Sequence, residues 1–86
     1  MDELGQLRKK VDSVDDQILK ALCERAKICK AIGEVKKTQA MQIRDFSREN
    51  QVYGRVKAKA VEFNLNPQQV EAVYREIVNM CSAVQE

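Results

Sequence analysis

The stretch ALCERAKICKAIGEVKK, residues 21–37, lies within a longer run in which apolar residues recur at alternating steps of three and four. The positions that share this spacing are Leu4, Leu7, Val11, Val14, Ile18, Ala21, Arg25, Ile28, Ile32 and Val35. Such spacing is typical of a heptad seam and predicts an α-helix over about residues 3–38, roughly 50 Å long. One seam position, Arg25, carries a permanent cation where the pattern favours a residue such as leucine.

Composition predicts one small helical domain over residues 1–86, because glycine, proline and aromatic residues are scarce. Fifteen Lys and Arg face thirteen Asp and Glu, and this balance does not indicate nucleic-acid or membrane binding. The chain has no histidine, and Cys23, Cys29 and Cys81 form no CxxC motif, so neither a metal nor a cofactor is expected. With no signal peptide or membrane-length apolar run, we expect a cytoplasmic protein with free thiols.

Two shorter helices are expected after a loop at about residues 39–45. The second, at about 46–63 with Asp45 or Ser47 as its cap, has an inward face of Val52, Val56, Ala60 and Phe63. A break at Asn64–Pro67 precedes the third helix, at about 67–85, in which Pro67 suits the first turn. Its inward residues are predicted to be Val70, Val73, Tyr74, Ile77, Cys81 and Val84.

The helix lengths predict a partner chain. The second and third helices are about half as long as the first, so they cannot cover its whole apolar seam. An uncovered apolar stripe favours association, and the simplest partner is a second copy. We therefore expect an all-α fold of three helices, one long and two shorter, in a six-helix homodimer. The alternative is a kink near Ser13 or Gly33 that gives a monomeric three-helix bundle.

Several polar residues fall on inward faces. Arg25 and Lys36 share one stripe, about 16 Å apart, with Cys29 and Ile32 between them. This spacing suits a small anion held between two cations. Glu49 lies on the apolar face of the second helix with Arg48 beside it. Gln85 lies in line with Tyr74, Val78 and Cys81 on the third helix.

A purely structural interpretation exists for each polar residue. Arg25 and Glu49 would form a buried ion pair, Lys36 would be solvated near a helix end, and Gln85 would fray. Together, however, the cations outnumber the acid, and this excess favours an anionic ligand. Arg8 lies about 25 Å from Arg25 along the helix, so the two meet at one ligand only across an antiparallel dimer.

Four segments carry a family resemblance: LRKKVDSVDDQIL, LCERAKICKAIGEVK, RDFSREN and YREIVNMCSAVQ. At these spacings the chain resembles the all-helical class of chorismate mutase over nearly its whole length. The resemblance implies an intertwined homodimer with two equivalent sites. It also implies chorismate as substrate, prephenate as product, a place in phenylalanine and tyrosine biosynthesis, and no cofactor.

The resemblance also implies residue roles. Arg8 would come from the neighbouring subunit, and Arg25 would bind a substrate carboxylate. Lys36 would contact a carboxylate and the ether oxygen, to which Gln85 would donate a hydrogen bond.

The remaining implied roles concern the second helix and one departure from the family pattern. Asp45 and Glu49 would lie near the ring hydroxyl, and Arg48 would help to organise the site. Cys81 stands where better-known members have serine, so a hydroxyl contact is replaced by a weaker thiol.

The reaction is an intramolecular Claisen rearrangement that needs no base, nucleophile or metal. Conformational restraint and charge stabilisation suffice, and these are what cations and an amide supply. Two alternatives remain: an isochorismate pyruvate-lyase on the same fold, or a non-catalytic helical dimer that serves as a regulatory or interaction module. An RNA-binding module is disfavoured, because the basic residues alternate with acids around the helices.

Overall fold

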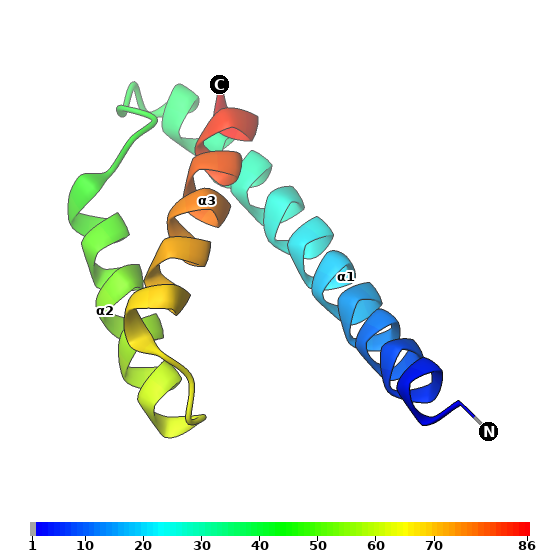
Figure 1. The fold of residues 1–86 in the computed structure, drawn as a ribbon. Helices are drawn as coiled ribbons and strands as arrows, with labels where there is room; N and C mark the ends of the chain where they lie inside the picture. Colours follow the sequence, from blue (N-terminus) through cyan, green and yellow to red (C-terminus); the bar gives the residue numbers. More distant parts are fainter. Residues whose placement is uncertain (1) are drawn as a thin grey trace.

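The computed structural model describes residues 2–86, which form three α-helices and no strand (Figure 1). The helices are α1 (Glu3–Thr38), α2 (Phe46–Glu62) and α3 (Pro67–Gln85). Each begins at an extended residue whose side chain accepts a hydrogen bond from a backbone N–H in the first turn. These caps are Asp2, Asp45 and Asn66, each with an N–O distance of 3.0 Å. The predicted all-α class is confirmed.

Helix α3 is the central element of the chain, because it packs against both α1 and α2. Figure 1 shows α2 and α3 as an antiparallel pair, with α3 crossing α1 near the C-terminal ends of both helices. Between α2 and α3 lies the main apolar cluster, with Val52, Tyr53, Val56 and Val78 at its centre. The chain therefore has one core at the α2–α3 interface and a second junction where α3 meets α1.

The N-terminal half of α1 extends away from the other helices (Figure 1). The buried residues of α1 are Cys29 and Gly33, both in its second half. The radius of gyration is 16.2 Å, whereas a compact domain of this length has a radius near 12 Å. Helix α1 is unbroken from Glu3 to Thr38, a span that includes Ser13 and Gly33, and Figure 1 shows it without a sharp bend. The alternative of a kinked helix folded into a three-helix bundle is therefore wrong.

In the second and third helices as predicted, three residues expected to point inward are exposed: Phe63 by 64%, Val73 by 58% and Val84 by 40%. Phe63 lies just beyond α2, as its C-terminal cap rather than its last turn. The buried residues of α3 are Val78, Cys81, Ser82 and Gln85. At 100° per residue, Val73 and Val84 lie well round the helix from that set. The buried face is therefore narrower than the apolar pattern predicted.

Gly33 permits the closest approach between α1 and α3. A Cβ atom at this position would lie 2.8 Å from the Cα of Gln85 and 3.0 Å from its carbonyl oxygen. Those atoms belong to backbone and cannot rotate away, so a side chain here would force the two helices apart. Gly33 therefore serves helix packing, whereas the sequence suggested it only as a possible kink.

Substituting Gly33 tests this junction. We expect Gly33→Ala to lower the free energy of unfolding by about 1–3 kcal/mol, the usual cost of overpacking. For a domain of this size, each 1 kcal/mol corresponds to about 4–8 °C in Tm. Thermal unfolding followed by circular dichroism at a fixed protein concentration measures the change.

The matched control is Gly54→Ala in α2, where an added Cβ would meet nothing within 4 Å. This change should raise stability by about 0.5–1 kcal/mol, because alanine favours a helix over glycine. Equal Tm values for the two variants would contradict the proposed contact.

Candidate active site

A cleft of about 270 Å³ lies where the second half of α1, the start of α2 and the end of α3 meet. Its lining residues are Arg25, Cys29, Ile32, Lys36, Ile43, Asp45, Arg48, Glu49, Val52, Val78, Cys81, Ser82 and Gln85. Apolar side chains and a few convergent polar groups are the usual composition of a small-molecule site. Nine residues were predicted for the substrate site, and all of them except Arg8 line this cleft. The eight are Arg25, Ile32, Lys36, Asp45, Arg48, Glu49, Cys81 and Gln85.

Arg25 extends from α1 toward two thiols. Its Nη1 atom donates to Cys81 Sγ at 2.7 Å, and Cys29 Sγ lies 3.8 Å from the same nitrogen. Both cysteines are buried. Burial raises the pKa of Cys29 to about 11, and a hydrogen bond with Cys81 acts in the same direction, against the nearby charges of Arg25 and Lys36. Cys29 therefore stays a neutral thiol at neutral pH.

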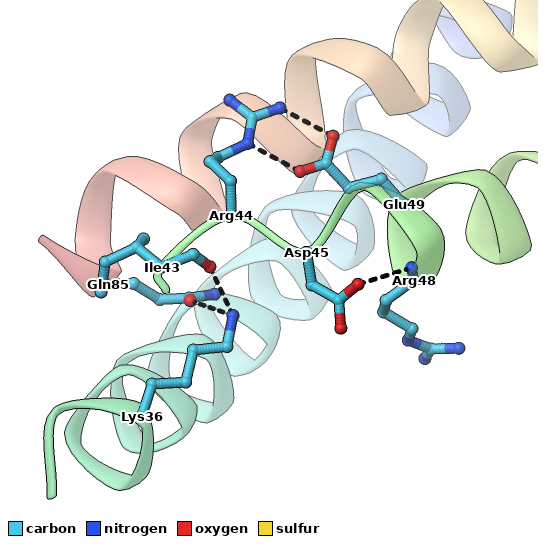
Figure 2. A network of polar contacts seen from close by, with 7 residues as sticks. All are labelled: Lys36, Ile43, Arg44, Asp45, Arg48, Glu49 and Gln85. Carbon is cyan, nitrogen blue, oxygen red and sulfur yellow. Dashed lines mark hydrogen bonds and ion pairs between the residues drawn. The ribbon is translucent and has the colours of Figure 1, made fainter. Parts of the chain in front are cut away.

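Lys36 and Gln85 meet across the α1–α3 junction (Figure 2). Lys36 Nζ donates to Gln85 Oε1 at 2.8 Å and also to the backbone carbonyl of Ile43. Because its amide oxygen accepts from Lys36, Gln85 has its Nε2 hydrogens left as donors. Gln85 is 9% exposed, and Lys36 is only partly exposed. The alternative in which Lys36 is solvated and Gln85 frays is therefore not observed.

Glu49 pairs with a residue that the sequence analysis did not single out. Arg44 donates two hydrogen bonds to its carboxylate, from Nε and Nη2, each 2.7 Å long (Figure 2). This contact raises the pKa of Arg44 above its ordinary value. The guanidinium also lies 5.3 Å from the centre of the Phe46 ring. The alternative in which Arg25 pairs with Glu49 is therefore wrong, and Arg44 holds Glu49 at the cleft wall.

Asp45 and Arg48 lie at the first turn of α2. The Asp45 carboxylate accepts a hydrogen bond from the backbone N–H of Arg48 at 3.0 Å and so caps the helix (Figure 2). Both residues line the cleft and are exposed. Asp45 thus has a structural task in addition to its place beside the cleft.

Two cations of the cleft, Arg25 and Lys36, have no carboxylate partner among residues 2–86. Glu49 is neutralised by Arg44, and within residues 2–86 neither Arg25 nor Lys36 lies within ion-pair distance of a carboxylate. Their hydrogen-bond acceptors are thiols, an amide oxygen and a carbonyl, which are all uncharged. Partly buried cations with neutral partners favour a bound anion.

Two polar residues were not predicted from the sequence: Ser82, which lines the cleft, and Arg44, which holds Glu49 at its wall. The predicted Arg8 does not line the cleft. Ser82 is buried and lies three residues before Gln85 and four after Val78. Helical spacing alone would therefore have placed it on the same face as these two residues. Arg44 lies in the loop before α2, where no periodic pattern applies. Arg8 is exposed on the projecting half of α1, far along the helix from Arg25.

No helix among the described residues has an apolar stretch long enough to cross a membrane.

Comparison with known proteins identifies the family. Residues 7–86 match the family described as chorismate mutase type II. The bifunctional chorismate mutase/prephenate dehydratase of Aquifex aeolicus is 36% identical over 88 residues, which cover 99% of this chain but only 24% of that protein. The chorismate mutase of Methanocaldococcus jannaschii is 33% identical over 66 residues, covering 77% of this chain and 67% of that protein.

A solved structure has the same fold. It is described as a conserved hypothetical protein from Pyrococcus furiosus, with a TM-score of 0.80 and 32% identity, and the match covers 100% of this chain and 99% of that one. Together, the three-helix fold, the cationic cleft and these matches show that the chain belongs to the chorismate mutase type II family.

Proposed function

We propose that this chain converts chorismate to prephenate in the cleft between its three helices. The observation that carries the proposal is the contact of Lys36 with Gln85 in a cleft whose cations lack carboxylate partners. Chorismate is a dicarboxylate with an ether bridge, so it presents anionic groups and an acceptor oxygen. The relatives whose printed names include chorismate mutase support the same activity.

The chemistry fits the side chains available. In the rearrangement one C–O bond breaks as one C–C bond forms within the same molecule, and no proton passes to the protein. Negative charge grows on the ether oxygen in the transition state. Lys36 Nζ and the free hydrogens of Gln85 Nε2 supply donors for that oxygen, already held in place by their mutual contact. Arg25 binds a carboxylate and so favours the compact conformer that reacts.

The other cleft residues complete the recognition of substrate. Glu49, held by Arg44, and Asp45, held at the start of α2, supply acceptors for the ring hydroxyl. Arg48 adds positive charge at the cleft edge. Cys81 offers its thiol beside the carboxylate bound by Arg25.

Ile32 contributes apolar surface between Arg25 and Lys36. It excludes water from the wall on which the two cations lie, and this strengthens their pull on the ligand.

The functional unit in this proposal is an intertwined six-helix homodimer. Five seam residues in the first half of α1, Leu4, Leu7, Val11, Val14 and Ile18, are each at least 50% exposed. The chain exposes 6891 Å², whereas a compact monomer of this mass exposes about 5,200 Å². The excess is of the order that one subunit buries in an obligate dimer.

Dimerisation also supplies the residue that the single chain lacks. Arg8 lies about 25 Å along α1 from Arg25, too far to share a small ligand within one chain. When two α1 helices pack antiparallel, Arg8 of each approaches the cleft of the other. Arg8 then binds the second carboxylate of the substrate, and each site contains residues of both subunits.

Removing either central cation tests the catalytic roles. We expect Arg25→Ala and Lys36→Ala each to lower kcat/KM for chorismate by at least about 10²–10³-fold, because each removes a charge-stabilising donor from a dry site. The loss of chorismate absorbance, with chromatographic identification of prephenate, measures turnover.

The matched controls are Arg55→Ala and Lys30→Ala, which remove the same charges from exposed helix positions outside the cleft. They should retain turnover close to that of the unmodified chain. Near-normal turnover in Arg25→Ala or Lys36→Ala would overturn the roles. If the folded, unmodified chain releases pyruvate from isochorismate but leaves chorismate unchanged, it is a lyase instead.

A mixing experiment tests the shared site. Arg8→Ala and Arg25→Ala should each be nearly inactive alone. A mixed dimer pairs the intact Arg25 of one variant with the intact Arg8 of the other, so it regains one complete site. After unfolding and refolding an equimolar mixture, about a quarter of the unmodified activity should return, because half of randomly assembled dimers are mixed. Activity that stays at the sum of the separate variants would rule out sites built from two subunits.

A further inference from the structure

Two buried thiols from different helices meet at the floor of the cleft. Cys29 belongs to α1 and Cys81 to α3, and they are 8% and 3% exposed. Both sulfurs approach the same atom, Arg25 Nη1, at 3.8 and 2.7 Å. A hydrogen bond between the two side chains contributes to the raised pKa of Cys29. The two sulfurs are therefore neighbours, although they lie 52 positions apart in the sequence.

The backbone around the pair is suited to a covalent link. Cys29 precedes Gly33 by four residues, and Cys81 precedes Gln85 by four, so each lies one turn before the closest contact of α1 with α3. Figure 1 shows that α1 and α3 cross at an angle, with the C-terminal ends of both helices on the same side of the crossing. The cysteines therefore face each other one turn from a point of backbone contact. A disulfide needs Cα atoms about 4.4–6.8 Å apart, so it can join only helices that approach closely, as α1 and α3 do at Gly33.

We propose that Cys29 and Cys81 form a reversible disulfide between α1 and α3, and that this bond switches off the cleft. The third thiol, Cys23, is exposed and does not line the cleft. It therefore provides an internal reference for the reactivity of a thiol outside the cleft. The effect on turnover rests on the proposed chorismate mutase activity, whereas formation of the bond does not.

The oxidant in this proposal is a peroxide, and the step balances with hydrogen peroxide. The Cys81 sulfur, beside the Arg25 guanidinium, attacks one peroxide oxygen. The O–O bond breaks, leaving a sulfenic acid on Cys81 and one water, which takes up the thiol proton. Cys29 then attacks that sulfur, the S–O bond breaks, and a second water leaves with the Cys29 proton. Two thiols and one peroxide give one disulfide and two waters.

The bond would change the cleft through Arg25. In the reduced chain both sulfurs contact the Arg25 guanidinium. A disulfide holds its sulfurs about 2 Å apart, so at least one sulfur must move relative to Arg25. The cation that binds the substrate carboxylate then loses its present support. A reducing agent that cleaves the disulfide restores both thiols and hence the original contacts.

The test combines mass spectrometry with an activity assay on the same samples. The purified protein is treated with hydrogen peroxide, its remaining thiols are alkylated, and proteolytic peptides are analysed without reduction. We expect a peptide pair joined through Cys29 and Cys81, lighter by two hydrogens than the separate thiol peptides. Chorismate turnover should fall at least tenfold and return after dithiothreitol. Cys23→Ser should behave in the same way, because Cys23 lies outside the cleft.

Cys29→Ser and Cys81→Ser supply the complementary arm, in which neither the joined peptide nor the dithiothreitol-reversible loss should occur. Failure to join Cys29 to Cys81 under conditions that oxidise Cys23 would overturn the proposal. Complete joining with unchanged turnover would overturn the switch. If the reduced protein never turns over chorismate, the proposed function fails, while the mass measurement still decides whether the disulfide forms.

Discussion

The close contact of α1 with α3 at Gly33 and Gln85 is the constraint on which the cleft depends. A glycine in α1 lets the backbone of α3 approach to a distance that leaves no room for a Cβ atom. The polar contacts of the cleft lie on either side of this point. Lys36 reaches Gln85 on one side, and Arg25 with Cys29 reaches Cys81 on the other. Since α2 packs on α3, its polar residues also depend on where α3 crosses α1.

The charge of the cleft depends on which arginine pairs with Glu49. Arg44 neutralises Glu49 with two short hydrogen bonds, and this leaves Arg25 and Lys36 with uncharged partners. Pairing Arg25 with Glu49 would have cancelled the charge that an anion needs. The loop before α2 therefore sets the charge of the proposed site through Arg44, although this residue is not among those that line the cleft.

Much of this arrangement could be predicted from local sequence, because helical periodicity determines which residues share a face. The seam placed Arg25 and Lys36 on one stripe, and both line the cleft. The observed helices begin where the sequence indicated, and the largest shift at a C-terminus is one residue, at Glu62. The prediction that Val73 points inward was wrong, because an apolar residue need not have a packing partner on its side of the helix.

Contacts between distant segments could not be predicted in the same way. The contact of Cys29 with Cys81 and the role of Gly33 both depend on the crossing of α3 with α1, that is, on its angle and its position along α1. Periodicity within one helix carries no information on that crossing. The Arg44–Glu49 pair depends on the path of a loop, which has no repeating pattern.

The most direct measurement is a crystal structure of the protein with an unreactive dicarboxylate analogue of chorismate. We expect one carboxylate on Arg25, the ether oxygen between Lys36 and Gln85, and the second carboxylate on Arg8 of a neighbouring subunit. An analogue bound elsewhere, or held in this cleft by one chain with Arg8 in solvent, would contradict a cationic site shared between two subunits.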